Sequence, residues 1–225
     1  RPSWRKMVTF AENVADTLSE LQTRLKTQLL RDVKGFVQEV RDFKIDFDKN
    51  GPLVRGITPS EAAERLGHFR GELERLETRM ETFGAGEELF ALPRTQYHEL
   101  IRTRKEVTLL HQLYSMYLEV VRTNEMLRNY KWVEVSDHIE SMRNLVDDFD
   151  SRSLKLPKCL REWKAFHELR ETITVFQDSM PLMEELIKPS VKTRHWAVVN
   201  AIIGVTLPHE DADSFCVAHL LESPL

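Results

Sequence analysis

Apolar side chains recur every three or four residues from position 14 to position 47, and this spacing constrains the fold more than any other feature of the chain. The stripe consists of Val14, Leu18, Leu21, Leu25, Leu29, Val33, Phe36, Val40, Phe43 and Phe47. Such spacing puts about one side chain per turn on the same face of an α-helix. A helix of this length exceeds the roughly 11–12 residues of an ordinary globular helix. The sequence therefore predicts one long helix over about residues 3–48, packed in a bundle or coiled coil.

Two more long helices are predicted after it. The segment Thr58-Pro59-Ser60-Glu61 is a helix start, because the threonine caps, the proline suits the first helical position and the glutamate completes a capping box. We expect this second helix to stop at Gly84-Ala85-Gly86. A third helix is expected over about residues 95–129. It carries two adjacent apolar stripes, so its wide apolar face would be buried against more than one neighbour or left as a docking face.

Shorter helices are predicted in the C-terminal part. They cover about residues 131–150, 158–180, 182–187 and 190–203, with Pro181 and Pro189 as breaks and Gly204 as a stop. A small turn and a helix start are expected near the end, and a soft boundary is expected near residues 151–157. The predicted fold is all-α. It consists of elongated antiparallel helical bundles in which long helices are followed by shorter helices punctuated by proline.

Composition limits the possible partners. Apolar residues make up 41% and charged residues 30% of the 225 residues, and the net charge of −4 comes from both signs spread along the chain. This pattern argues against nucleic acid as a partner, and no apolar run reaches the roughly 18–20 residues that span a bilayer. No signal peptide is recognised. Two cysteines, Cys159 and Cys216, are too few for a disulfide framework and suggest reduced cytosolic thiols. Because the chain starts without a methionine and stops just after an apolar stretch, we expect an internal piece of a longer polypeptide.

Motifs for cofactors and catalysis are absent from the sequence. No glycine stands in a P-loop or Gly-x-Gly-x-x-Gly frame. One group of possible metal ligands lies near the C-terminus: His195, His209, Glu210, Asp211, Asp213, Cys216 and His219. Its spacing matches no known ligand frame, so ordinary surface and packing roles are favoured. Paired carboxylates such as Glu184-Glu185 are typical of solvated helix faces. We therefore expect no catalytic, cofactor-binding or metal-binding residue.

One ordered series of residues is more specific than generic helix. It contains Leu156, Pro157, Arg161, Trp163, Phe166, Phe176, Pro181, Arg194, His195 and Trp196. In this order and context, the series resembles the start of the linker region in dynein heavy chains. The resemblance is strong over residues 132–225, weaker over 59–129, and only that of a generic tail helix over 1–58. The Glu-Ser-Pro-Leu ending resembles the axonemal outer-arm type, whereas Asn200-Ala201-Ile202-Ile203 is less polar than in many relatives.

The resemblance implies a division into a tail helical bundle at residues 1–150 and the start of the linker at residues 151–225. It implies a mechanical segment of an ATP-driven, minus-end-directed motor for ciliary or flagellar beating, located in the cytoplasm and the axonemal cytoskeleton. ATP and Mg²⁺ would bind in a AAA+ ring elsewhere in the chain. The implied partners are the rest of the heavy chain, other heavy, intermediate or light chains and, indirectly, microtubules. The large aromatic residues of the series would be packing anchors. For the Arg194-His195-Trp196 triplet, we expect a buried tryptophan and a salt-bridged or capping arginine rather than a switch at the histidine.

Two other interpretations compete with this one. A stand-alone spectrin-like scaffold would bind partner proteins through a helix groove, and a helical enzyme would contain an unrecognised site. The ordered motif series favours the motor segment over the scaffold. The missing phosphate and metal frames disfavour the enzyme.

Overall fold

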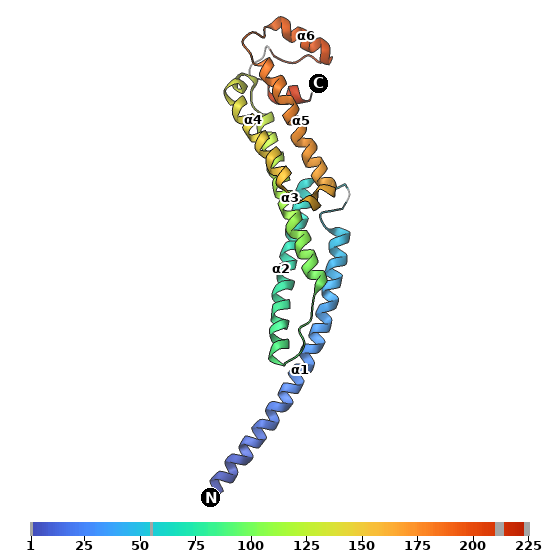
Figure 1. Cartoon of the computed structure of the whole chain (residues 1–225), viewed down its shortest axis with the longest axis vertical. Helices are drawn as coiled ribbons and strands as arrows, with labels where there is room; N and C mark the ends of the chain where they lie inside the picture. Colours follow the sequence, from blue (N-terminus) through green and yellow to red (C-terminus); the bar gives the residue numbers. More distant parts are fainter. Residues whose placement is uncertain (1, 55, 210–213, 223–225) are drawn as a thin grey trace. The chain divides into compact units, whose positions relative to one another are not determined.

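The structure is a computed structural model that describes residues 2–54, 56–209 and 214–222 (Figure 1). The described residues form seven α-helices and one 3-10 helix. These are α1 (Pro2–Asn50), α2 (Pro59–Leu89), α3 (His98–Arg128), α4 (Trp132–Lys155), η1 (Lys158–Glu162), α5 (Lys164–Leu186), α6 (Thr193–Ile203) and α7 (Val217–Leu221). Within the described ranges there is no strand, only an isolated antiparallel bridge between Lys131 and Cys216. The prediction of an all-α fold is confirmed.

Two compact units divide the chain. The first contains Arg1–Ile57 and Glu64–Thr108, and the second contains Thr58–Ala63 and Leu109–Leu225. This division follows packing and does not test where a tail would end and a linker begin. The boundary between residues 150 and 151 therefore stays a prediction.

The core of the first unit lies between the C-terminal half of α1, helix α2 and the start of α3. Phe36 of α1 is fully buried, with its ring centroid 5.1 Å from that of Phe83 and 5.0 Å from that of Tyr97. About three helical turns further along α1, the ring of Phe47 packs edge-on against that of Phe69 of α2, with 5.3 Å between the ring centroids. Edge-to-face contacts at these distances are favourable ring arrangements. The apolar stripe predicted for α1 therefore forms a core, but only from Val33 onwards.

The turn after α1 depends on a glycine. The Gly51 amide donates to the carbonyl of Phe47 at 2.9 Å, and a Cβ at position 51 would lie 2.2 Å from that oxygen. No other residue fits such a close approach without moving the backbone. The predicted cap of α2 is also present, since the Glu61 amide donates to Thr58 Oγ1 at 3.2 Å.

The expected end of α2 at Gly84-Ala85-Gly86 is wrong, because the helix continues to Leu89. Both glycines serve close packing instead of termination. A Cβ at Gly86 would lie 3.2 Å from the Leu29 side chain, and one at Gly84 would lie 2.9 Å from that of Arg94. The connector to α3 is then held by the buried Glu87, whose carboxylate accepts hydrogen bonds from the amide and hydroxyl of Thr95. Helix α3 accordingly begins at His98, later than expected.

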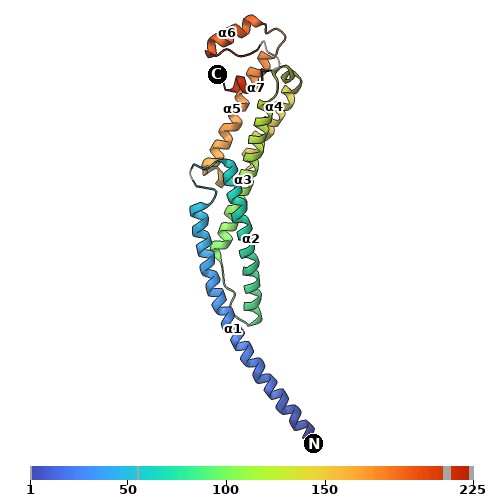
Figure 2. The same ribbon diagram turned by 180° about the vertical axis from the view of Figure 1, so that it is seen from behind.

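In the N-terminal half of α1, the apolar stripe is exposed. Leu18 and Leu25 are 60% and 53% exposed, whereas Val40 is 3% exposed. Figures 1 and 2 show this half extending past the end of α2 and the connector that follows it. The part of the stripe before Leu29 is therefore exposed in the described structure.

The second unit is organised around α4 and α5, which lie side by side, and the remainder of α3 (Figures 1 and 2). The apolar stripes expected on these two helices are mostly buried, at Val135, Met142, Val146, Phe149, Phe166, Leu169, Ile173, Phe176 and Met180. Their other members, Trp132, Ile139 and Trp163, are half-buried. The two stripes of α3 are buried or half-buried throughout. The wide face of α3 is therefore filled, and it does not form the free docking face that the sequence left open.

Several predicted helix ends in this unit are wrong. Helix α4 continues past residue 150 to Lys155, because its last turns are held by ion pairs and a buried hydrogen bond described below. Residues 158–162 form a separate 3-10 turn, so α5 starts at Lys164. The break at Pro181 does not occur, since α5 runs through this exposed residue to Leu186. Burial of Met180 and Met183 on the inner face of the helix offsets the missing amide. Helix α6 begins at Thr193, three residues later than expected, and ends at Gly204 with φ 71°.

Candidate functional site

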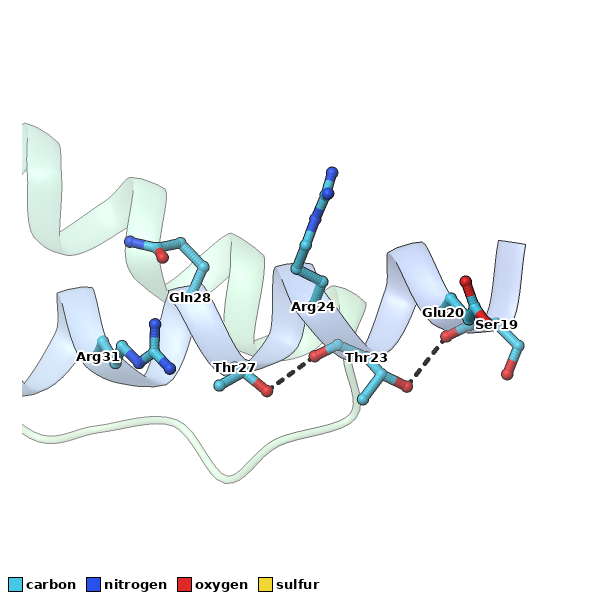
Figure 3. Close-up of a pocket in the computed structure, with 7 residues that line it drawn as sticks. All are labelled: Ser19, Glu20, Thr23, Arg24, Thr27, Gln28 and Arg31. Carbon is cyan, nitrogen blue, oxygen red and sulfur yellow. Dashed lines mark hydrogen bonds between the residues drawn. The ribbon is translucent and has the colours of Figure 1, made fainter. Parts of the chain in front are cut away.

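The hollows on the described surface lie along one helix or between neighbouring helices. The one in Figure 3 is lined only by α1 residues, from Ser19 to Arg31. Its hydroxyls are already used by the helix, since Thr27 Oγ1 donates to the Thr23 carbonyl at 2.9 Å and Thr23 Oγ1 to that of Ser19 at 3.0 Å. A single polar helix face cannot enclose a substrate. This hollow is a solvated surface.

Two further hollows are grooves between helices. In the first unit, a groove between α1 and α2 is bridged by Arg79, which pairs with Glu39 and lies over the ring of Phe36 at 5.0 Å. In the second unit, a groove between α3 and α5 has Tyr117 and Phe176 in its floor.

The possible metal ligands near the C-terminus are only partly described. Glu210, Asp211 and Asp213 lie outside the described residues. Among the described residues, no group of three or more His, Cys, Asp or Glu side chains could hold a metal ion. None of the described helices has the length and apolar character needed to cross a bilayer.

Two of the histidines cap helices instead. The Lys192 amide donates to His195 Nδ1 at 2.9 Å at the start of α6, and the Cys216 amide donates to His219 Nδ1 at 3.3 Å at the start of α7. An Nδ1 that accepts a hydrogen bond leaves the proton of neutral imidazole on Nε2. The 3.3 Å contact from Arg194 Nε to His195 Nε2 is therefore a packing contact rather than a hydrogen bond.

The Leu156-Pro157 pair sits at the exit from α4. Leu156 is extended, with φ −60° and ψ 147°, as expected for a residue before proline. Pro157 is the residue before η1, and Arg161 donates from Nη2 to the carbonyl of Leu154 at 3.1 Å. These residues turn the chain from α4 into α5.

Trp163 separates η1 from α5. Its backbone is extended, with φ −87° and ψ 136°, and its carbonyl accepts a hydrogen bond from the Phe166 amide at 3.0 Å. Phe166 and Phe176 then face the core from α5, at 6% and 3% exposure. The structure thus makes Phe166 and Phe176 core residues, while Trp163 is half-buried and Pro181 is exposed on α5.

Trp196 belongs to an aromatic cluster that consists of Trp132, Trp196, His209 and Phe215. The Trp196 ring lies 5.7 Å from that of Trp132 and 5.6 Å from that of Phe215, both edge-on, and is stacked on His209 at 5.3 Å. The backbone reinforces this contact, because the Trp132 amide donates to the carbonyl of Phe215 at 2.8 Å. The cluster therefore fastens the last segment of the second unit to the start of α4.

Sequence reasoning missed this cluster as a unit. Trp132 falls in the helix expected over residues 131–150 and Phe215 in the turn expected near the end of the chain. Helical periodicity carries no information about contacts between residues so far apart in the sequence. The only signal was that bulky aromatics occur at both places. Of the ten motif residues, Leu156, Pro157, Arg161, Trp163 and Phe166 lie around η1, and Arg194, His195 and Trp196 lie at the start of α6. Phe176 and Pro181 lie within α5 and belong to neither group.

Charged groups between helices of the second unit are held in defined pairs. Arg152 of α4 donates two hydrogen bonds to Glu119 of α3, at 2.8 and 2.5 Å, and these bonds lower the pKa of the Glu119 carboxyl. Arg170 of α5 contacts Asp150 at 2.5 Å and the buried Ser153 hydroxyl at 2.6 Å. These groups link neighbouring helices, which is the arrangement expected of a structural element.

Comparisons with known proteins identify relatives over the whole chain. The family described as "Dynein heavy chain, N-terminal region 2" matches residues 100–225. The dynein gamma chain of the flagellar outer arm from Chlamydomonas reinhardtii is 38% identical over 99% of this chain. Dynein axonemal heavy chain 5 from Rattus norvegicus is 33% identical and dynein axonemal heavy chain 8 from Mus musculus 35% identical, each over the full 225 residues. This chain spans only 5–6% of the length of these relatives.

Proposed function

Because this chain belongs to the dynein heavy chain family, we propose that it is a non-catalytic strut from the tail-to-linker region of an axonemal dynein. Its role is mechanical: it joins the part of the motor that is anchored to the part that hydrolyses ATP. The observation that carries the proposal is the family match over residues 100–225, which contain helices α3 to α7. The axonemal assignment is supported by relatives named as outer-arm or axonemal chains.

The second unit has the construction that a force-bearing element needs. Each helix satisfies its own backbone hydrogen bonds, and α4 and α5 share a continuous apolar interface. Ion pairs between α3 and α4 and between α4 and α5 oppose sliding of one helix along another. Such an assembly resists bending because any bend must separate packed side chains.

ATP hydrolysis, its Mg²⁺ and the contact with microtubules belong, in this proposal, to other parts of the heavy chain. Other dynein chains are its expected protein partners. The isolated chain should neither turn over ATP nor bind nucleotide in a calorimetric titration. Measurable turnover would exclude the proposed role.

Force transmission is tested in the whole motor. A flexible Gly-Ser insertion between Leu156 and Pro157 would interrupt the α4–η1–α5 connection without removing any core side chain. Microtubule gliding driven by tail-anchored motors should slow strongly, while ATP turnover is kept. The matched control is the same insertion next to Leu53, an exposed loop residue of the first unit. Unchanged gliding with the first insertion would contradict a mechanical role for this connection.

A further inference from the structure

The N-terminal half of α1 presents an uninterrupted heptad pattern to solvent. Positions 4, 7, 11, 14, 18, 21 and 25 alternate in steps of three and four, which is the a/d spacing of packed helices. Their large side chains are exposed: Trp4 68%, Met7 61%, Val14 40%, Leu18 60%, Leu21 38% and Leu25 53%. Isolated exposed apolar residues are ordinary, but an ordered row of this length marks an interaction surface. We refer to it as the open stripe.

The open stripe is too wide for a single partner helix. The flanking e and g positions are occupied by Val8, Phe10, Ala15, Thr17 and Gln22, with Arg24 the only charge among them. Phe10 is itself 70% exposed. The other charges, such as Glu12, Asp16 and Glu20, lie on the opposite side of the helix. A broad uncharged face needs more than one neighbouring helix to cover it.

The C-terminal half of α1 is an example of the same face when other helices pack on it. From Val33 to Phe47 the stripe is buried against two elements, α2 and the start of α3. This cover ends where Gly86, in the last turn of α2, meets Leu29. The open stripe begins at that point and follows the same face of an unbroken helix. It is continuous with an existing three-helix core.

We propose that the open stripe is covered by a pair of helices from the same heavy chain that lie outside these 225 residues. Relatives that match this chain throughout are about twenty times longer, so ample polypeptide exists to supply them. A second copy fits less well, because a two-stranded coiled coil sets its pairing through opposite charges at e and g, and the open stripe has almost none there. The inference goes beyond the proposed mechanical role, and of the preceding proposal it uses only the membership of the dynein heavy chain family.

Site-specific photo-crosslinking in the complete heavy chain tests the occupant. A benzophenone side chain would replace Leu18 on the open stripe, and in a matched control it would replace Glu20 on the opposite side. We expect Leu18 to yield an adduct that keeps the mass of one heavy chain and maps to a peptide outside this segment, with Glu20 at background. Adducts that join two heavy chains, adducts to another subunit, or no adduct at Leu18 above the Glu20 level would each overturn the proposal.

A second measurement needs no substitution. Hydroxyl-radical labelling oxidises exposed Trp and Met, and Trp4 and Met7 are such residues in the isolated chain. In the complete heavy chain, we expect labelling of both to be lost. Equal labelling in the two settings would show that the stripe stays open and would contradict the inference.

Discussion

At the scale of single residues, Trp196 is the buried tryptophan of the motif series and lies in the aromatic cluster of the second unit. Its ring contacts three other rings that come from α4 and from the segment after α6. Replacing a buried tryptophan with alanine removes this contact area and leaves a cavity. We expect Trp196→Ala to lower the free energy of unfolding of the second unit by about 3–5 kcal/mol.

The comparison is Trp4→Ala, which removes the same side chain from a 68% exposed position. In the isolated chain this change should stay within about 0.5 kcal/mol. Urea unfolding followed by far-ultraviolet circular dichroism measures both. Similar losses for the two variants would show that the aromatic cluster is not a stabilising contact.

We expect Tyr114 to make the stability of the second unit fall at alkaline pH. Burial, followed by the nearby charge of Glu168, raises the pKa of its phenol to about 12, above an ordinary value of about 10. Because the pKa is higher in the folded than in the unfolded state, the protonated phenol contributes to the free energy of unfolding. This contribution is complete below about pH 10 and is lost as pH rises through about 12. Tyr114→Phe removes this titration. The variant should therefore lose less stability than the original chain between about pH 9 and pH 11 in urea unfolding. If the stability of the variant and of the original chain fell in parallel with pH, the loss would not come from titration of Tyr114.

The sequence predicted the burial of large aromatic residues better than the hydrogen bonds of single polar side chains. The burial of Phe166, Phe176 and Trp196 followed from helical spacing or from the motif, because a large aromatic on an apolar face has few alternatives to the core. The capping histidine of α6 did not follow, since a hydrogen bond from a backbone amide to an imidazole depends on local geometry that spacing does not encode. This cap is a structural role for His195, which is the kind of role that the sequence analysis preferred over a switch.

At the scale of helices, α4 and α5 are joined by a small polar network as well as by their stripes. Arg170 of α5 donates to Asp150 and to the hydroxyl of Ser153, which is fully buried and itself donates to the Asp150 carbonyl at 2.7 Å. Removing the arginine leaves buried polar atoms with fewer partners, and this is more costly than losing a surface pair.

We expect Arg170→Met to destabilise the second unit by about 1–3 kcal/mol. Arg143 provides a matched control, since it also links α4 to α5 but pairs with Glu184 at a more exposed position. Arg143→Met should cost no more than about 1 kcal/mol. Thermal unfolding of the two variants distinguishes them, and equal shifts in melting temperature would argue against a special role for the buried network.

Helix ends were the least predictable feature, for two physical reasons. The glycines at 84 and 86 looked like a stop signal, yet they allow Arg94 and Leu29 to approach the helix closely. Pro181 looked like a break, yet the inner face of α5 stays packed on both sides of it. In both cases tertiary packing outweighed a local preference of about 1–3 kcal/mol.

At the scale of the whole molecule, the helical class and the buried stripes followed from sequence periodicity, because a helix with one apolar face must bury it. The same periodicity could not show which parts of the stripes are covered within these 225 residues. Positions 14 to 25 and 33 to 47 of α1 have equally apolar patterns, but only the second set is buried. Coverage is a property of neighbouring segments, and spacing within a single helix contains no information about them.

This difference within a single helix gives a prediction for the isolated chain. Val40→Gln places a polar side chain at a 3% exposed position and should reduce the stability of the first unit by about 1–3 kcal/mol. Leu18→Gln makes a comparable change on the open stripe, where the side chain is 60% exposed, and should stay within about 0.5 kcal/mol. Urea unfolding measures both. In the complete heavy chain the two substitutions should become similarly costly, because the proposed covering helices would then bury position 18 as α2 and α3 bury position 40. A Leu18→Gln variant as stable as the original in both settings would mean that nothing in the heavy chain packs on this face.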